Sequence, residues 1–321
     1  MSLTRREALR RLGAAGLVLG GSAAAAKLLH DPGGLDLARS QIKPQTRDYR
    51  LPVGGELPAM AIARNETDPA RLVQKAVEAL GGMRRFVSRG DVVVVKPNIG
   101  WDRTPAHAAN TNPHVVAEVV RLAYDAGAKH VVVTDASCNE PNRCFQRSGI
   151  WKAAYDVGAE VVLPGEHRFR RMRLKGEVLD EWPVFTPLVN ADKVINVPVA
   201  KHHNLAGFTA AMKNWYGLLG GRRNRLHQNI DVSIADLATF LQPTLTVVDA
   251  VRVLLRNGPQ GGNIADAKDF FTVIASTDQV AADALACTFI GKTPEEIPYI
   301  KMGAERGLGT MNWRDLSVVE V

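Results

Sequence analysis

Short runs of β-branched apolar residues alternate with longer amphipathic segments along most of this chain. Residues 92–95 and 131–133 are unbroken valine runs, a pattern typical of strands that a parallel sheet buries on both faces. Each run is followed directly by polar residues, which marks where the strand ends. Further strands are expected at residues 60–63, 161–163, 194–197, 245–248 and 271–275, with an edge strand at 316–319.

The segments between these runs place apolar residues three and four apart, which predicts helices that pack on one face. Asp68-Pro69 and Asn112-Pro113 each join a capping side chain to a proline, so we expect helices from there to about Phe86 and to Gly127. The basic stretch 167–175 lacks periodicity and is expected to be irregular. Further helices are expected at residues 150–157, 205–219, 230–241 and 279–290, the last capped by Asp278, and from Pro294 onward.

Strands that alternate with helices predict an α/β fold, in which a mainly parallel sheet is flanked by helices. The chain is long enough for one such domain or for two closely joined lobes. Because crossover connections are right-handed, the carboxyl ends of parallel strands share one edge of the sheet, where such folds usually bind ligands.

The N-terminal segment resembles an export signal. The adjacent pair Arg5-Arg6 precedes an Ala- and Gly-rich stretch, 12–26, that ends in three alanines, as in Tat signal peptides. This stretch is too short and too weakly apolar for a stable transmembrane span, although an uncleaved signal still tethers a protein to the membrane. We therefore expect a periplasmic or otherwise exported protein that meets the Tat translocase, with a signal at 1–26, a linker at 27–58 and an α/β domain at 59–321.

Charge and composition exclude several partners. The net charge of +7 falls to +4 without residues 1–26, because that segment holds four arginines and one glutamate. Aromatic residues make up 6% of the chain, and no basic stripe is interleaved with them, so we expect no nucleic-acid partner. The glycine-rich phosphate loops of nucleotide-binding folds and the Gly-x-Ser-x-Gly elbow of hydrolases are missing from the sequence.

The three cysteines lack the Cys-x-x-Cys spacing of zinc and iron–sulfur sites. Cys287 lies in an apolar helical run, which favours a buried thiol. Cys138 and Cys144 flank a predicted loop, and an oxidising compartment leaves open whether they pair.

Polar residues gather where the predicted strands end. Lys96 and Asn98 follow the first valine run, Asp135 follows the second, Lys201 and His203 come after the strand at 194–197, and Asp249 comes after the strand at 245–248. Taken singly, a lysine or an aspartate at the end of a strand is most often a solvated loop residue. Together they predict one cleft lined by convergent polar groups.

Two later segments add candidate ligand contacts. Lys213 falls off the apolar face of the helix expected at 205–219, and Asn214 follows it. The stretch 220–225 offers glycine backbone and three arginines to an anion, or is a solvated basic turn. His227 comes just after it. The glycine-rich stretch 257–262, with Gly258 and Gly262, allows close approach of backbone to a ligand, as an ordinary turn also does.

The chain carries a series of short motifs: Gly90-Asp91, Lys96-Pro97-Asn98, Lys201-His202-His203, Ala211-Met212-Lys213-Asn214, His227, Asp249, Asn257-Gly258-Pro259, and Asp278 with Asp283. In order and spacing these motifs resemble the DUF362 family, over about residues 59–301. The family usually has Lys-x-Lys-Thr-His at the third motif, so Lys201 and His203 match while Val199 and His202 depart from it. Many relatives carry a ferredoxin-type cysteine insert; this chain lacks it, so no iron–sulfur cluster is expected.

The resemblance implies the fold more than an activity, because the family has no established function. Residues 112–135 also resemble the N-terminal part of nickel-pincer lactate racemases, with a proline, a helix, Ala-Gly and a strand that ends in polar residues.

We expect an enzyme that acts on a small anionic molecule by proton transfer, with a metal or cofactor of unknown identity. His203 would be the general acid or base, because imidazole titrates near neutral pH, with Lys201 and Lys213 as its catalytic partners. Asp135 and Asp249 would hold a metal or orient a histidine. The alternative is a periplasmic protein that binds an anion or cofactor without chemistry. The remaining predicted ligand contacts are Lys96, Asn98, Asn214, His227, Gly258 and Gly262.

Overall fold

The computed structural model describes residues 47–52 and 57–321, together with scattered residues between 4 and 22. The chain divides into two units, residues 1–43 and 44–321. In the first unit, Thr4 Oγ1 donates a hydrogen bond to Glu7 Oε2 (2.9 Å). The predicted signal peptide at 1–26 and linker at 27–58 lie for the most part outside the described residues.

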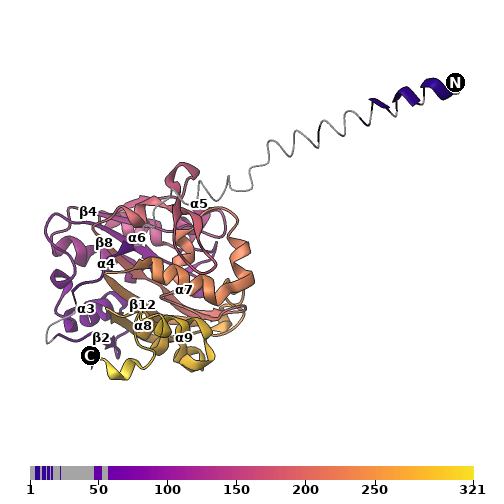
Figure 1. Ribbon diagram of the computed structural model, residues 1–321. Helices are drawn as coiled ribbons and strands as arrows, with labels where there is room; N and C mark the ends of the chain where they lie inside the picture. The colour runs from indigo at the N-terminus through magenta and orange to yellow at the C-terminus, as the bar shows by residue number, and fades with distance from the viewer. Residues whose placement is uncertain are drawn as a thin grey trace. The chain divides into compact units, whose positions relative to one another are not determined.

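The second unit is built on one central sheet whose strands run mainly parallel, which confirms the predicted α/β class (Figure 1). Within the described sheet, β13 and β10 run antiparallel to their neighbours, and the other neighbouring pairs are parallel. From edge to edge the strands are β14 (Val318–Glu320), β2 (Met60–Ala63), β13 (Ala267–Ser276), β12 (Leu245–Leu254), β8 (Lys193–Val197), β3 (Val92–Pro97), β4 (His130–Thr134) and β5 (Glu160–Val162); β9 (Val199–His203) also pairs with β12, and β10 (Gly207–Thr209) pairs with β9.

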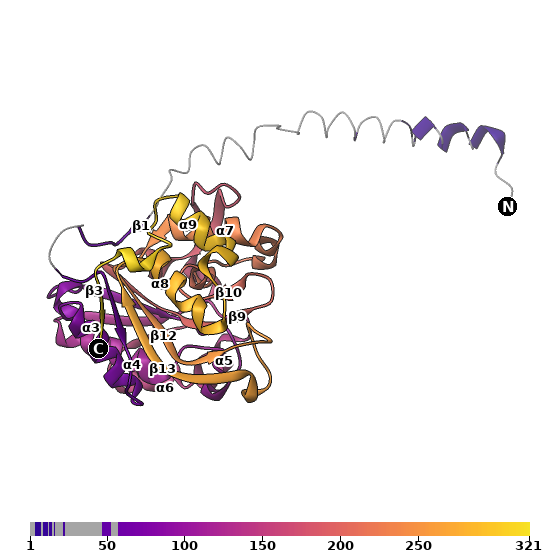
Figure 2. The ribbon, with the colours of Figure 1, turned by 90° about the horizontal axis from the view of Figure 1, so that it is seen from below.

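The valine runs supply two apolar cores, because successive side chains of a strand point to opposite faces of the sheet. Val93 and Val95 are buried in one core, and Val94 is buried in the other. Figure 2 shows α3 and α4 on one side of β12, and α8 and α9 on the other. The first core is covered by α3 (Pro69–Ala79), α4 (Pro113–Asp125), α5 (Pro141–Arg147) and α6 (Ile150–Asp156), and the second by α7 (Ile230–Phe240), α8 (Gln279–Ala286) and α9 (Pro298–Glu305).

Several predicted boundaries are confirmed. The strand at 60–63 matches β2, and the helices predicted at 112–127 and 230–241 match α4 and α7. Asp278 caps α8 by accepting hydrogen bonds from the backbone N–H groups of Val280 and Ala281. In contrast, the helix predicted to reach Phe86 ends at Ala79, because Gly81 and Gly82 adopt positive φ angles of 97° and 79° that do not continue a helix.

Two other predictions are wrong. The helix expected at 205–219 is a short strand, β10, followed by a 3₁₀ helix, η5 (Lys213–Leu218), because residues 207–209 pair with β9 instead of coiling. The stretch 167–175, expected to be irregular, contains β6 (Phe169–Arg173), which forms an antiparallel pair with β7 (Glu181–Phe185). The two strands predicted at 245–248 and 271–275 are also longer, at ten residues each, and form a long antiparallel pair.

At the N-terminal side of the domain, β1 (Arg47–Asp48) lies within the predicted linker and pairs with β11 (Leu241–Gln242) in parallel. Residues 44–321 form one compact unit. Among the residues that the structure describes, no helix has both the length and the apolar character of a membrane span.

Candidate functional site

A cavity of about 650 Å³ lies where β3 and β4 end, and it is completed by β9 and by the segment 209–227. The sheet topology explains its position, because β3 lies between β4 and β8 in parallel and the chain leaves all three strands at one edge. The residues predicted from the sequence that line the cavity are Lys96, Asn98, Asp135, Lys201, His203, Lys213, Asn214 and His227.

The pleat of β9 decides which of its polar residues reach the cavity. Lys201 and His203 are two residues apart, so they share one face of the strand, whereas His202 points to the other face. Lys201 and His203 line the cavity, and His202 does not. Instead, His202 Nδ1 accepts a hydrogen bond from the backbone N–H of Gly258 (3.2 Å).

Lys96 and Asp135 form a buried ion pair at the ends of β3 and β4, with Nζ and Oδ1 2.7 Å apart. Asp135 Oδ2 accepts a hydrogen bond from the backbone N–H of Ile99 (2.7 Å). Burial lowers the pKa of Lys96, and the Asp135 carboxylate opposes this shift. The ion pair joins the ends of β3 and β4. Both carboxylate oxygens of Asp135 are therefore occupied by protein groups, Lys96 Nζ and the backbone N–H of Ile99.

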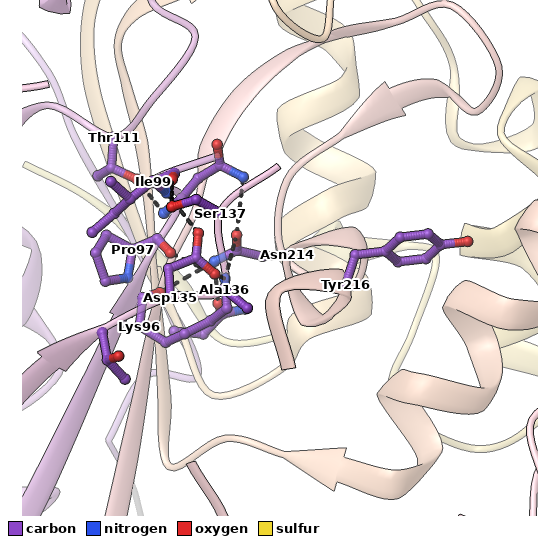
Figure 3. A network of polar contacts seen from close by, with 12 residues as sticks. Lys96, Pro97, Ile99, Thr111, Asp135, Ala136, Ser137, Asn214 and Tyr216 are labelled. Atoms are coloured by element: carbon purple, nitrogen blue, oxygen red, sulfur yellow. Dashed lines mark hydrogen bonds and ion pairs between the residues drawn. The ribbon is translucent and has the colours of Figure 1, made fainter. Parts of the chain in front are cut away.

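Amide side chains join this ion pair to Lys201, and the first of them, Asn214, lies beside Lys96 and Asp135 (Figure 3). Lys96 Nζ donates to Asn214 Oδ1 (2.9 Å), which also accepts from Asn98 Nδ2 (3.2 Å). Asn98 Oδ1 accepts in turn from Lys201 Nζ (3.1 Å). Asn214 Nδ2 donates to Asn196 Oδ1 (2.8 Å). Asn196 was not predicted, although a lone amide within the apolar strand β8 is the signal that points to it.

Asp283 holds the segment that carries Lys213 and Asn214. Its carboxylate accepts hydrogen bonds from the backbone N–H groups of Ala211 (2.5 Å) and Met212 (2.9 Å). Burial raises the pKa of Asp283 to about 7. The two N–H bonds fix the start of η5 and, through it, the position of the two side chains that follow.

Lys201 and Lys213 are buried lysines that form no ion pair with a carboxylate of the described residues, although the Asp231 carboxylate acts on Lys213 from a longer distance. They are 1% and 7% exposed. Lys201 Nζ donates to the carbonyl oxygen of Ala109 (2.5 Å) as well as to Asn98, and Lys213 Nζ lies 3.9 Å from the centre of the Tyr216 ring. Burial is the main cause that lowers the pKa of Lys201 to about 7 and the pKa of Lys213 to about 8.

His203 is held as a hydrogen-bond donor toward the cavity. Its Nδ1 accepts from the backbone N–H groups of Leu205 (3.1 Å) and Ala206 (3.2 Å), so the ring proton resides on Nε2. Burial and then the charges of Lys213 and Lys201 lower its pKa to about 2. A second proton on Nδ1 would face two N–H donors. The geometry is therefore unfavourable to the predicted role of His203 as general acid or base.

Three predicted site residues do not line the cavity. Asp249 lies within β12, where its Oδ2 accepts from the backbone N–H of Asn112 (2.7 Å) and its Oδ1 from that of Val251 (3.0 Å). Gly258 lies against β9, where a Cβ atom would come 1.9 Å from the carbonyl oxygen of His202. Gly262 is exposed. The structure therefore does not bring the two predicted metal ligands, Asp135 and Asp249, together in the cavity, and the Asp249 carboxylate accepts hydrogen bonds from backbone N–H groups instead.

Among the described residues, no three His, Cys, Asp or Glu side chains cluster as metal ligands would. Cys138 lines the cavity and Cys144 is buried, and both are free thiols in this structure, so the pairing left open by the sequence is not formed.

The cavity is strongly cationic. Arg223 lines it and also donates to the carbonyl oxygens of Ala136 (2.7 Å) and Ser137 (2.5 Å), which secures the loop after β4. Arg222 and Arg225 line its exposed side. Asp135 is the one carboxylate among the described lining residues, and Lys96 already neutralises it. The remaining lining charges all favour an anion.

Residues 93–288, more than half of the chain, match the profile of a family described as a domain of unknown function, DUF362. The chain belongs to the DUF362 family. One curated relative is the thylakoid-associated protein sll1697 of Synechocystis sp. (strain ATCC 27184 / PCC 6803 / Kazusa), which is 27% identical over 241 residues, 73% of each protein.

Among solved structures, the lactate racemase apoprotein of Thermoanaerobacterium thermosaccharolyticum is 12% identical, with a TM-score of 0.41. The alignment covers 77% of the DUF362 chain and 62% of the racemase chain, so the DUF362 chain spans less than two thirds of that protein.

Proposed function

We propose that this DUF362 protein is an enzyme that binds a small anionic molecule in the cationic cavity and transfers a proton to or from it, with Lys201 as the group that carries the proton. The observation that supports this most directly is that Lys201 and Lys213 are buried and form no ion pair with a carboxylate in the part of the chain that the structure describes. A protein keeps an unpaired buried charge at a cost in stability, which an anionic ligand offsets when it binds.

Lys201 suits proton transfer better than His203 does. Its pKa of about 7 populates both the amine and the ammonium form near neutral pH, which is the condition for an efficient acid–base group. Asn98 Oδ1 and the Ala109 carbonyl oxygen hold its Nζ in place.

The neighbouring groups then have distinct tasks. Lys213 supplies fixed positive charge for the negative charge that develops on an enolate-like or oxyanion intermediate. The Nε2–H group of His203 is a further donor toward that charge. The Lys96–Asp135 pair and Asn214 keep the lysines and amides in position.

The alternative function, binding without chemistry, rests on the same cations. An anion beside Lys201 raises the pKa of that lysine, and a lysine that is fully protonated in the complex clamps the ligand instead of moving its proton. The two functions therefore differ in whether Lys201 exchanges protons while the ligand is bound.

The test is hydrogen–deuterium exchange at carbon, followed by NMR, on a panel of small carboxylates and phosphate esters that first stabilise the protein in a thermal-shift assay. We expect Lys201→Met to keep ligand affinity within about tenfold but to lose exchange at least a hundredfold, a typical contribution of an acid–base group. Lys213→Met should weaken binding as well. Lys152→Met, in an exposed ion pair with Asp156, is the matched control.

Two results separate the alternatives. If ligands bind but none exchanges, and both lysine variants lose affinity equally, the protein is a binder. If no anion stabilises the protein, both functions are wrong.

We also propose that the protein is exported by the Tat pathway to the periplasm or beyond, with an N-terminal membrane tether if the signal stays uncleaved. The Arg5-Arg6 pair and the Ala- and Gly-rich stretch after it support this. Since Tat substrates fold before they cross the membrane, the cavity would be assembled inside the cell.

A further inference from the structure

The cationic side chains of the cavity form two groups that differ in burial. Lys201 and Lys213 belong to the buried part of the wall, whereas Arg222 and Arg225 are exposed and line its outer part. In the part of the chain that the structure describes, neither of these two arginine side chains forms an ion pair or a hydrogen bond. Both groups therefore present to one cavity positive charge that no ion pair neutralises.

The loop that carries the two exposed arginines is anchored at its start to the hairpin of β6 and β7. The backbone N–H of Gly220 donates to the carbonyl oxygen of Pro183 (2.9 Å), and Trp182 Nε1 donates to the carbonyl oxygen of Gly220 (2.8 Å). A Cβ atom at residue 220 would come 2.7 Å from the ring of Phe169, so the loop packs directly against the hairpin.

Arg223, which lies between the two exposed arginines in the chain, anchors the other side of the loop. It begins the 3₁₀ helix η6 (Arg223–Asn229), and its guanidinium donates to the carbonyl oxygens of Ala136 (2.7 Å), Ser137 (2.5 Å) and Tyr216 (3.2 Å). One arginine thus fixes the loop to the end of β4, and its neighbours remain without a protein partner. The segment 220–225 is therefore an anchored part of the cavity wall rather than a solvated turn.

A single anionic group would neutralise only part of this charge. With Lys96 paired to Asp135, the cationic lining residues that remain are Lys201, Lys213, Arg222, Arg223 and Arg225. The cavity volume of about 650 Å³ is that of sites that enclose whole organic molecules. A molecule of that size with one anionic group at the buried lysines extends toward the arginines, where a second anionic group would find two guanidinium partners.

We propose that the ligand carries two separate anionic groups, as a dicarboxylate or a phosphonate-bearing carboxylate does. Its inner group lies at Lys201 and Lys213, and its outer group lies at Arg222 and Arg225. The outer contact selects dianions over monoanions of the same shape. This inference rests on the proposed anion site and specifies the class of molecule that the site accepts.

The test compares probes that differ in one charge. Isothermal titration calorimetry at pH 7 and low ionic strength, where exposed charges are screened least, would measure succinate, glutarate, adipate and 3-phosphonopropionate. Each is compared with its monoamide, in which an uncharged amide of nearly the same shape replaces one carboxylate. We expect at least one dianion to bind about fivefold or more tightly than its amide, the upper range for an exposed ion pair. This exceeds the factor of two that two equivalent ends contribute.

Variants of the exposed arginines locate the effect. The Arg222→Gln, Arg225→Gln double variant should reduce the dianion-to-amide ratio to within about twofold. It should leave the affinity of the monoamides nearly unchanged, because their carboxylate still binds at the buried lysines. The Arg71→Gln, Lys75→Gln double variant is the matched control and should keep the ratio of the unmodified protein, since it removes two exposed positive charges from α3, outside the cavity lining.

The outcomes distinguish this inference from the proposed function. If the monoamides bind and every dianion binds no more tightly, the ligand with two anionic groups is wrong and the anion site stands. A dianion preference that survives the Arg222→Gln, Arg225→Gln variant overturns the placement of the outer group. Binding by none of the probes overturns the anion site, and the ligand with two anionic groups along with it.

Discussion

Gly217 lies directly against the carboxylate of Asp135: a Cβ atom at residue 217 would come 1.8 Å from Asp135 Oδ1 and 2.8 Å from Lys96 Nζ. The backbone carbonyl of Gly217 also accepts a hydrogen bond from the N–H of Ala136 (3.1 Å). Any side chain here would displace the buried ion pair. Residue 217 must therefore be glycine for η5 to pack against the ends of β3 and β4.

We expect Gly217→Ala to separate Lys96 from Asp135 and to lower the free energy of unfolding by about 3 kcal/mol or more, since each charge would be left buried without its partner. The melting temperature, measured by calorimetry, should fall by about 6 °C or more. Gly262→Ala is the control, because nothing lies within 4 Å of a Cβ atom there. Equal melting temperatures for the two variants would contradict the close packing described above.

Lys213 should destabilise the ligand-free protein in a way that depends on pH. Its folded-state pKa, about 8, lies below its ordinary value of 10.5. The unfolded chain therefore binds the extra proton between these values, so the cost of the buried charge is fully present below about pH 8 and disappears as pH rises through 10.5. Lys213→Met should melt several degrees higher than the unmodified protein at pH 6, and this advantage should vanish near pH 10.5. A variant that melts lower at pH 6 would show that Lys213 has a stabilising partner.

Anion affinity should fall as pH rises, because the lysines bind an anion in their charged form. The pKa values of about 7 for Lys201 and about 8 for Lys213 place this loss between about pH 7 and pH 9. Sulfate, whose own charge is constant in this range, is the suitable probe for calorimetry. Above pH 8 its affinity should decrease by roughly tenfold per pH unit for each lysine that takes up a proton on binding. Lys201→Met should show a shallower slope, and an affinity independent of pH would exclude both lysines from the anion site.

The sequence predicts those parts of the fold that depend on the local pattern of apolar residues. The valine runs of β3 and β4 and the caps at Asn112 and Asp278 are visible in the sequence, and the structure contains them as expected. The segment 205–219 was mispredicted because its apolar residues repeat at helical spacing while residues 207–209 pair with β9. A long-range partner outweighs local periodicity here.

The site was predictable where strand ends decide the position. Lys96 lies near the end of β3, Asp135 directly follows β4 and Lys201 lies in β9, the strand after β8, and the topology brings all three to one cavity. The apolar pattern also predicts that Asp249 follows a strand, but β12 continues past it to Leu254. The sequence does not predict which nitrogen of His203 carries the proton. The structure shows that Nδ1 is an acceptor, because the backbone N–H groups of residues 205 and 206 point at it.

Export should depend on Arg5 and Arg6 together. The Tat pathway selects the paired guanidinium groups, whereas lysine keeps the charge but not the planar, bidentate geometry. We expect the Arg5→Lys, Arg6→Lys double variant to accumulate inside the cell at least tenfold over the unmodified protein, as measured by fractionation and immunoblotting. Arg10→Lys, Arg11→Lys is the matched control, because it makes the same two changes outside the pair and should leave export unchanged. Normal periplasmic levels of the first variant would show that the segment is not a Tat signal. Because the cavity lies in residues 96–259, the retained protein should still bind anions, so the export test and the ligand test are independent of each other.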